Sequence, residues 1–215
     1  MISVLVAAYN AAPYIVRFFA AIKEQTFKDF ELVIMDDGST DDTADMVMAY
    51  GCGIQGLRLI ESSHRGVATC RKELISQAKG DFIIFTDADD IPEADYLEKM
   101  HEQIKINNAD AVICSYISEY DDISVHAKIN IPTGFHDEKD WEEIKKNKLL
   151  YDESTGNADN APTVWNLLAK KALYLEASEY IDDTLMQGED AVISYGVLLR
   201  AKCVAVLEDE LYHYV

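Results

Sequence analysis

The first half of the chain alternates between short apolar runs and longer segments whose apolar residues recur at helical spacing. Four runs have the length and composition of buried strands, and they cover residues 3–8, 30–35, 57–61 and 82–86. Helical spacing follows each run, over residues 14–24, 43–50, 67–79 and 93–107. Strands and helices that alternate through short connections form parallel sheets with right-handed crossovers. The pattern therefore predicts an α/β fold with a Rossmann-like, mostly parallel sheet flanked by helices.

The pattern changes near residue 110. The alternation over 116–131 is looser and predicts an antiparallel excursion, and the polar segment 151–162 is predicted to be a loop that orders over a bound ligand. The other elements expected here are strands over 111–115, 164–168 and 203–207 and helices over 140–150 and 191–200. No repeat or low-complexity linker interrupts the chain. We therefore expect one domain, 1–215, made of a first half (1–110) and a second half (111–215).

Polar residues stand directly after three of the predicted strands. Asn10 follows the first strand, Asp36 and Asp37 follow the second, and Asp87 and Asp89 follow the fourth. The carboxyl ends of parallel strands meet at one edge of a sheet, which is where open α/β sheets bind ligands. A single acidic turn could simply be solvated, but three polar clusters at one edge are a stronger signal. We therefore expect a ligand site there.

The acidic turn Asp87-Ala88-Asp89-Asp90 indicates the kind of ligand. Carboxylates at positions 87 and 89 would lie close together in low-dielectric surroundings, where like charges repel. A hard divalent cation removes this conflict, since Mg²⁺ and Mn²⁺ take oxygen ligands and bridge carboxylates to phosphates. The turn therefore predicts a metal–diphosphate site.

The charge and composition limit the partners. Lys and Arg number 19 against 39 Asp and Glu among 215 residues, which gives a net charge of −20. Such a surface repels nucleic acid, whose binding depends on phosphate neutralisation. No apolar run reaches the roughly 18 residues of a membrane span, and the N-terminus lacks the basic segment of a signal peptide. Four scattered cysteines without metal-binding spacing are expected to be reduced, as in a cytosolic protein.

Several motifs, each weak alone, follow one another in an order that resembles the inverting family 2 glycosyltransferases, which have the GT-A fold of nucleotide-diphospho-sugar transferases. They extend over nearly the whole chain: Ala7-Ala8-Tyr9-Asn10, Asp36-Asp37-Gly38-Ser39-Thr40-Asp41, the stretch 66–71, Asp87-Ala88-Asp89-Asp90, Val164-Trp165-Asn166 and Gly188-Glu189-Asp190. The resemblance implies that residues 1–110 bind a nucleotide-diphosphate sugar, with a UDP-sugar as the first expectation, and that residues 111–215 bind the acceptor. It also implies transfer of the sugar to a hydroxyl group, with Mn²⁺ or Mg²⁺ as cofactor.

The resemblance implies roles for four residues around the nucleotide. Ala8 and Tyr9 would line the nucleoside pocket, with Tyr9 near the base, and Asp37 would accept a hydrogen bond from the base. Arg71 would approach the nucleotide. Two alternatives stay open. Tyr9 could instead close the end of its strand, and Arg71 could pair with Glu73 or another acidic neighbour on a surface this acidic.

By the same resemblance, Asp89 would hold the cation against the diphosphate, and Asp87 would face the ribose or the metal shell. Asp190 would be the general base, with Glu189 as the second choice. A bound cation stabilises the charge that develops on the leaving phosphate, and a carboxylate accepts the acceptor's proton as the oxygen attacks. Asp190 is expected to open a helix, which lowers its pKa, whereas a base works best near the working pH; burial or Glu189 could raise its pKa again.

The remaining polar and aromatic candidates are more ambiguous. Trp165 and Asn166 would bind the acceptor, although Trp165 could also be a core residue. His213 could complete the metal shell or simply pack against its neighbours. His64 and Arg65 are expected on the surface of a loop.

Three other functions stay open at this point. A nucleotidyltransferase also pairs a parallel sheet with acidic metal ligands, but its first loop is usually Gly-rich and basic, and the loop 9–13 contains no glycine. A phosphatase of the haloacid dehalogenase type normally carries its paired aspartates after the first strand. The third alternative is a non-catalytic module that binds sugar nucleotides.

The resemblance also suggests a cellular setting. Surface polysaccharide or glycolipid synthesis in the cytoplasm is expected, with at most peripheral contact to the inner face of the membrane. The expected partners are a nucleotide-diphosphate sugar and a glycan or lipid-linked acceptor, and no nucleic acid.

Overall fold

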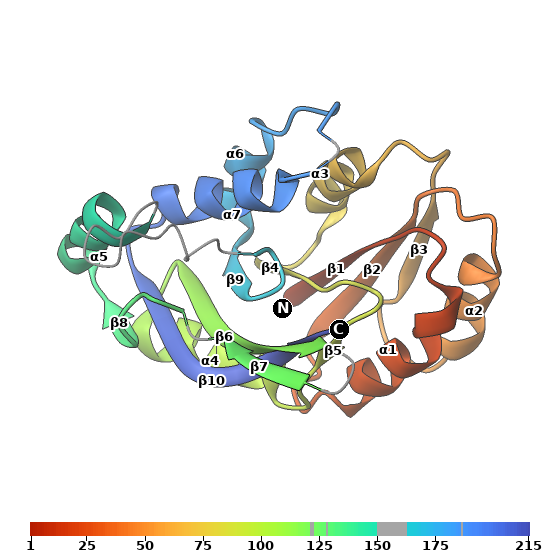
Figure 1. The fold of residues 1–215 in the computed structure, drawn as a ribbon, viewed down its shortest axis with the longest axis horizontal. Helices are drawn as coiled ribbons and strands as arrows, with labels where there is room; N and C mark the ends of the chain where they lie inside the picture. Colours follow the sequence, from red (N-terminus) through yellow and green to blue (C-terminus); the bar gives the residue numbers. More distant parts are fainter. Residues whose placement is uncertain (121–122, 128, 150–162, 186) are drawn as a thin grey trace.

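Helices cover both faces of one β-sheet (Figure 1). The computed structural model describes residues 1–120, 123–127, 129–149, 163–185 and 187–215. The first half supplies four parallel strands, β1 (Ile2–Ala8), β2 (Phe30–Asp36), β3 (Arg58–Glu61) and β4 (Phe82–Phe85). The helices between them are α1 (Ala12–Glu24), α2 (Thr43–Tyr50) and α3 (Val67–Gln77). The predicted alternation of strands and helices in this half is confirmed.

The rest of the chain adds shorter and more varied elements. Its strands are β5 (Ile91–Pro92), β6 (Ala111–Tyr120), β7 (Ile123–Ala127), β8 (Gly134–His136), β9 (Leu167–Lys170) and β10 (Val204–Tyr214). Its helices are α4 (Tyr96–Asn107), α5 (Glu138–Ile144), the π-helical turn η1 (Lys145–Leu149), α6 (Lys171–Ser178) and α7 (Glu189–Arg200). The antiparallel pair β6–β7 confirms the excursion predicted over 116–131.

The order of the strands shows how the two halves join. Within the described residues the sheet has ten strands, in the order β3-β2-β1-β4-β9-β6-β10-β5, with β7 beside β6 and β8 beside β10. β9 runs antiparallel to both β4 and β6 and lies between them. The long strand β10 is parallel to β6 and antiparallel to β5 and β8. The mostly parallel first half therefore continues into a mixed second half.

Successive side chains of β1 pack on opposite faces of the sheet. Leu5 lies in one buried cluster with Leu74 of α3, and Val4 lies in another with Phe18 of α1 and Val47 of α2. The period of two in the strand sends neighbouring residues to opposite faces, and both faces are covered by apolar helices. This arrangement explains why the strand reads as an unbroken apolar run.

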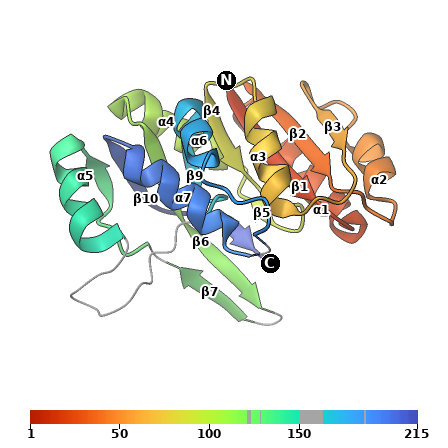
Figure 2. The ribbon, with the colours of Figure 1, turned by 90° about the horizontal axis from the view of Figure 1, so that it is seen from above.

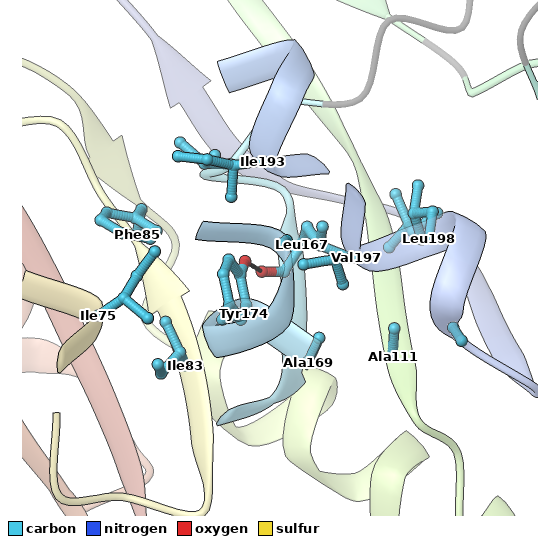
Figure 3. Close-up of a cluster of buried hydrophobic side chains, with 14 of the residues drawn as sticks. Ile75, Ile83, Phe85, Ala111, Leu167, Ala169, Tyr174, Ile193, Val197 and Leu198 are labelled. Carbon is cyan, nitrogen blue, oxygen red and sulfur yellow. Dashed lines mark hydrogen bonds between the residues drawn. The ribbon is translucent and has the colours of Figure 1, made fainter. Parts of the chain in front are cut away.

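The first of these clusters also links the two halves (Figure 3). Tyr174 of α6 is fully buried, and its ring centroid lies 5.9 Å from that of Phe85 at the end of β4. Its hydroxyl donates a hydrogen bond of 2.8 Å to the carbonyl oxygen of Leu167 in β9. Ile193 of α7 belongs to the same cluster. α7, whose first turn carries Glu189 and Asp190, therefore shares a buried cluster with the strand that ends at the acidic turn.

Several expectations need correction. The strand expected over 164–168 begins only at Leu167, and the helix α6 that follows it directly was not predicted. The helix expected from residue 93 begins at Tyr96, because Pro92 pairs with Tyr212 in the short strand β5. The last strand was predicted to end at residue 207 but continues to Tyr214. The predicted loop 151–162 lies outside the described residues.

Candidate active site

A pocket of about 300 Å³ opens at the carboxyl edge of the sheet, where β1 and β4 end. It is lined by Ala7, Ala8, Tyr9, Ala11, Tyr14, Arg71, Asp87, Ala88, Asp89, Tyr214 and Val215. A second hollow of about 190 Å³ shares the first three of these residues and adds Asp37, His64, Gly66, Val67 and Cys70. The two hollows therefore adjoin along the end of β1. Every first-half residue given a role from the sequence lines one of them.

Asp37 is held in place by the backbone of the loop before α3. Its two carboxylate oxygens accept hydrogen bonds from the backbone N–H groups of Arg65, at 2.7 Å, and Gly66, at 2.8 Å. Burial alone would raise the pKa of Asp37, but these donors and the nearby Cys70 and Ser62 side chains lower it below its ordinary value. Asp37 is therefore an ionised hydrogen-bond acceptor fixed at the edge of the smaller hollow.

His64 lies in the loop beside Asp37 and makes specific contacts with Tyr9 and Asp37. Its ring stacks on Tyr9 with centroids 4.2 Å apart and planes 24° apart, and its Nδ1 lies 3.1 Å from the carbonyl oxygen of Asp37. It adopts a left-handed φ of 49°, which is uncommon for a residue with a side chain. The expectation that His64 lies on the surface of a loop is confirmed, since its side chain is 58% exposed, and the contacts with Tyr9 and Asp37 are an addition that the sequence did not predict. The side chain of Arg65 also pairs on the surface, with Glu73.

The acidic turn after β4 is supported from both halves of the chain. The backbone N–H of Asp87 donates to the hydroxyl of Tyr212, at 3.0 Å, and the side chain of Asp90 accepts from the backbone N–H of Val215, also at 3.0 Å. The guanidinium of Arg17 donates to the carbonyl oxygen of Asp89. Sequence reasoning missed Arg17 and Tyr212, because nothing local to either residue indicates its partner.

The carboxylates of this turn are poorly solvated. Burial raises the pKa of Asp89, and the negative charge of Asp87 raises it further. Asp90 is fully buried, and burial raises its pKa to about 7 despite the hydrogen bond from Val215. The repulsion between the like charges of Asp87 and Asp89 agrees with the repulsion inferred from the sequence.

These carboxylates fit a divalent cation that a ligand helps to coordinate. Asp87 and Asp89 line one pocket and offer the hard oxygen donors that Mg²⁺ and Mn²⁺ take. Among the described residues, no group of three or more His, Cys, Asp or Glu side chains could hold a metal by itself. His213 is occupied elsewhere, since its two ring nitrogens lie 2.8 Å from Glu119 and 2.7 Å from Glu93. The chemistry fits a cation held by one or two carboxylates, with phosphate oxygens and water completing its shell.

Arg71 connects the acidic turn to the first turn of α7. Its buried guanidinium lies 3.0 Å from Asp87 and 2.5 Å from Glu189, and it also pairs with Asp190. A pairing of Arg71 with Glu73 is wrong, because Glu73 pairs with Arg65, but the expected pairing with other acidic residues is confirmed. Asp87 and Asp190 thus lie beside one guanidinium.

The two acidic residues of α7 differ in their access to solvent. The side chain of Glu189 is 8% exposed, whereas that of Asp190 is 32% exposed. A general base must reach the proton that it removes, so geometry favours Asp190 over Glu189. The resemblance put Asp190 first and Glu189 second, and the exposed fractions of the two side chains favour the same order.

The two predicted acceptor residues are packed inside the protein. Trp165 is 4% exposed and stacks on Tyr212, at 4.7 Å between centroids, and on Tyr214, at 5.6 Å. Asn166 is 2% exposed and donates from its side chain to the carbonyl oxygen of Cys114, at 3.3 Å. Neither side chain offers a surface to an acceptor, so the core alternative for Trp165 is correct. The stack ends instead at Tyr214, which lines the pocket.

Among the described residues no helix is both long and apolar enough to cross a bilayer.

Known proteins resemble this chain in sequence. The Bacillus subtilis (strain 168) protein EpsH, named as a glycosyltransferase, is 29% identical over 216 residues, which cover 99% of this chain and 60% of EpsH. The chain thus spans less than two thirds of that relative.

Solved structures share the fold over almost the whole chain. The structure of S. aureus TarS residues 1–349 in complex with UDP-GlcNAc has a TM-score of 0.78 at 23% identity and matches 99% of this chain and 57% of that TarS 1–349 chain. A mannosyltransferase from Pyrobaculum calidifontis in complex with GDP-Man and Mn²⁺ has a TM-score of 0.67 at 20% identity, over 99% of this chain and 56% of that protein. These likenesses confirm the GT-A fold.

The family model described as Glycosyl transferase family 2 matches residues 3–174, which is most of the chain. The motifs at residues 7–10, 36–41 and 87–90 lie inside this match, and each contributes residues to the lining of the hollows described above. This protein belongs to glycosyl transferase family 2.

Proposed function

We propose that the chain transfers a sugar from a UDP-sugar to a hydroxyl acceptor, with inversion at the anomeric carbon and with Mn²⁺ or Mg²⁺ as cofactor. The observation that carries the proposal is that Arg71 holds Asp87, beside the phosphate pocket, and Asp190, at the start of α7, around one guanidinium. TarS has been solved with UDP-GlcNAc and the Pyrobaculum enzyme with GDP-Man and Mn²⁺. Both complexes support a nucleotide-diphosphate sugar as donor.

The first half would bind and orient the donor. Tyr9 and Ala8 offer a contact surface to the nucleoside, and the ionised Asp37 accepts a hydrogen bond from an N–H group of the base. Asp89 and Asp87 would hold the cation, which when bound supplies Lewis-acid stabilisation of the charge on the leaving diphosphate. This division of roles explains why so acidic a chain could bind an anionic ligand.

The second half would supply the base. In the reaction an acceptor oxygen forms a bond to the anomeric carbon while the bond from that carbon to the diphosphate oxygen breaks, and the nucleoside diphosphate leaves. The acceptor's proton passes to the carboxylate of Asp190, which is the more exposed of the two acidic residues of α7. Because the acceptor attacks opposite the leaving group, the configuration inverts. Arg71 acts on this step through Asp190 and is a positioning residue.

The cellular role follows only from the family and the relatives. We propose a glycan or lipid-linked acceptor, synthesis of surface polysaccharide or glycolipid, and a location in the cytoplasm, with at most peripheral contact to the membrane. The halves 1–110 and 111–215 would act as donor and acceptor parts of one domain.

The products released from a panel of nucleotide sugars test this function. The protein is incubated with each sugar and Mn²⁺, and we expect free UDP from one of them. Release of pyrophosphate would indicate the nucleotidyltransferase alternative, and release of inorganic phosphate would indicate a phosphatase. Tight binding without any release would indicate a non-catalytic module.

Replacing Asp89 tests the cation site. Asp89→Asn removes a charged ligand, and losing even an outer-shell partner costs roughly 10–100-fold in metal affinity. We expect Mn²⁺ to lose its effect on UDP binding, as measured by calorimetric titration with and without the metal. Asp81→Asn, which changes a highly exposed aspartate away from the pocket, is the matched control. An unchanged Mn²⁺ dependence in Asp89→Asn would contradict the assignment.

A further inference from the structure

The β6–β7 hairpin has one apolar side that nothing in the described structure covers. Tyr120 pairs with Ile123 across the two strands, and Ser118 pairs with both Val125 of β7 and Tyr214 of β10. Residues directly opposite one another in a sheet point to the same side. Tyr120, Ile123, Val125 and Tyr214 therefore form one surface, here called the hairpin face. Their exposed fractions are 58%, 65%, 47% and 43%.

The opposite side of the same strands is polar and internally paired. His126 of β7 lies 2.9 Å from Glu210, and His213 of β10 lies 2.8 Å from Glu119 of β6. The hairpin is thus amphipathic, with its ionisable groups satisfied on one side and its large apolar groups exposed on the other. An exposed apolar patch of several neighbouring side chains marks a binding surface rather than ordinary exposure.

The hairpin face begins at the wall of the candidate active site. Tyr214 lines the pocket with Asp87 and Asp89, and its ring stacks on the buried Trp165. β6 pairs with β9 only over its first three residues and then runs on, so that the β6–β7 hairpin projects past the neighbouring strands (Figure 2). An acceptor whose hydroxyl reaches the pocket can therefore extend along this face without leaving the protein.

The chemistry of the hairpin face distinguishes among occupants. Tyrosine rings suit contact with a sugar ring, but Ile123 and Val125 offer no hydrogen bonds and suit hydrocarbon. A second copy of the chain is a poor fit, because four side chains fall well short of the roughly 1,200 Å² that a specific protein interface buries. The face also lacks the basic residues that would draw an acidic protein to a membrane surface.

We propose that the hairpin face binds the apolar part of an amphiphilic acceptor, that is, an alkyl or prenyl chain attached to the sugar or alcohol that accepts the transferred residue. The inference rests on the proposed function, because it takes the pocket beside Tyr214 as the place where the acceptor's hydroxyl reacts. It goes further by favouring a lipid-linked acceptor over a purely glycan one and by naming the residues that bind its apolar part.

Binding of octyl β-glucoside and methyl β-glucoside tests the proposal. Both are titrated calorimetrically below the micelle concentration, with and without UDP and Mn²⁺. We expect the octyl compound to bind at least about tenfold more tightly, since its chain removes apolar surface from water. The double variant Ile123→Ser/Val125→Ser should lose this preference. Ile106→Ser, which makes the same change at a residue of α4 that is 73% exposed, is the matched control and should keep it.

The outcomes separate the proposal from the function on which it rests. Equal binding of the two glucosides, or an octyl preference that survives in the double variant, would overturn the proposal. So would an equal loss in Ile106→Ser, or a dimer in sedimentation that the double variant dissociates. UDP titrations run in parallel should be unchanged in the double variant. If UDP fails to bind the unaltered protein, the proposed function fails, and the titrations without nucleotide still decide whether the face binds the octyl chain.

Discussion

The two halves of this protein fix their polar site residues by different means. In the first half, Asp37 follows β2 directly and is held by backbone N–H groups of one neighbouring loop. In the second half, Glu189 and Asp190 stand on the first turn of α7 and are held by a side chain from the other half, Arg71. The difference teaches that Asp37 is placed by contacts local to its strand end, whereas the proposed base depends on a contact formed between the halves.

Removing the proposed base should have the largest effect and would sharpen the division of labour between the halves. Asp190→Asn should lower turnover roughly 10²–10⁴-fold, because the acceptor's proton loses its acceptor, while UDP affinity stays unchanged. Steady-state UDP release and UDP titration measure the two quantities. Glu189→Gln is the matched control and should cost less turnover. The reverse ranking of the two variants would assign the base to Glu189.

Removing Arg71 would break the ion pairs that it forms between the halves, with Glu189 and Asp190. Arg71→Met leaves Asp87, Glu189 and Asp190 without their common cation, and loss of one partner from a buried ion pair costs roughly 3–5 kcal/mol. We expect the lower end of this range in urea unfolding, because two of the three carboxylates are partly exposed to solvent.

The exposed Arg65, which pairs with Glu73, provides the comparison for that experiment. Arg65→Met should leave the free energy of unfolding nearly unchanged, because surface ion pairs contribute little. Similar unfolding curves for both variants would show that the Arg71 cluster does not hold the halves together.

Two aromatic residues, one from each half, should respond in opposite ways. Trp165→Ala removes a buried ring and should cost about 3–5 kcal/mol of unfolding free energy. Tyr9→Ala removes a ring that is 47% exposed beside the smaller hollow, so it should leave stability nearly intact and weaken UDP binding by about 1–3 kcal/mol. Urea unfolding and UDP titration of both variants measure the contrast. A stable Trp165→Ala variant that has lost acceptor binding would restore the acceptor role of Trp165.

The smallest effect concerns pH and lies on the polar side of the β6–β7 hairpin. Burial would lower the pKa of His213, but Glu93 and Glu119 raise it above its ordinary value of 6.5. Because the folded state binds the proton more tightly, this contribution to stability is complete below pH 6.5 and is lost as the pH rises through the raised pKa. His213→Gln should therefore cost less than roughly 1 kcal/mol at low pH and almost nothing at high pH. Thermal unfolding across this pH range measures the difference, and a cost that grows with pH would contradict the assignment.

The features of the fold and the site that could be predicted from the sequence are those with a local signal. The strands of the first half and the polar residues at their ends were predicted correctly, because apolar runs and the residues directly after them are local signals. Trp165 was placed in a strand for the same reason, since it stands in an apolar stretch. Its burial depends on Tyr212 and Tyr214, which no local pattern connects to it.

Longer-range contacts account for the other errors. The helix predicted over 93–107 directly follows Pro92, and proline often begins a helix, but here Pro92 pairs with Tyr212 in β5. Glu189, which accepts a hydrogen bond from Arg71, lies 118 positions away in the chain. From the sequence, a pairing of Arg71 with nearby Glu73 was therefore equally reasonable. The stacking of His64 on Tyr9 accompanies a left-handed backbone conformation at His64 that the sequence does not predict.

The support of the acidic turn by β10 has a consequence for the order in which the protein is made. The N–H of Asp87 and the carboxylate of Asp90 bond to residues 125 positions later in the chain. While these residues are still inside the ribosome, a nascent chain already contains β1 to β4 but lacks the hydroxyl and the N–H that brace the turn. Contacts this distant form late, because the loop between them must first be closed. The acidic turn should therefore reach its final geometry only after β10 has been synthesised.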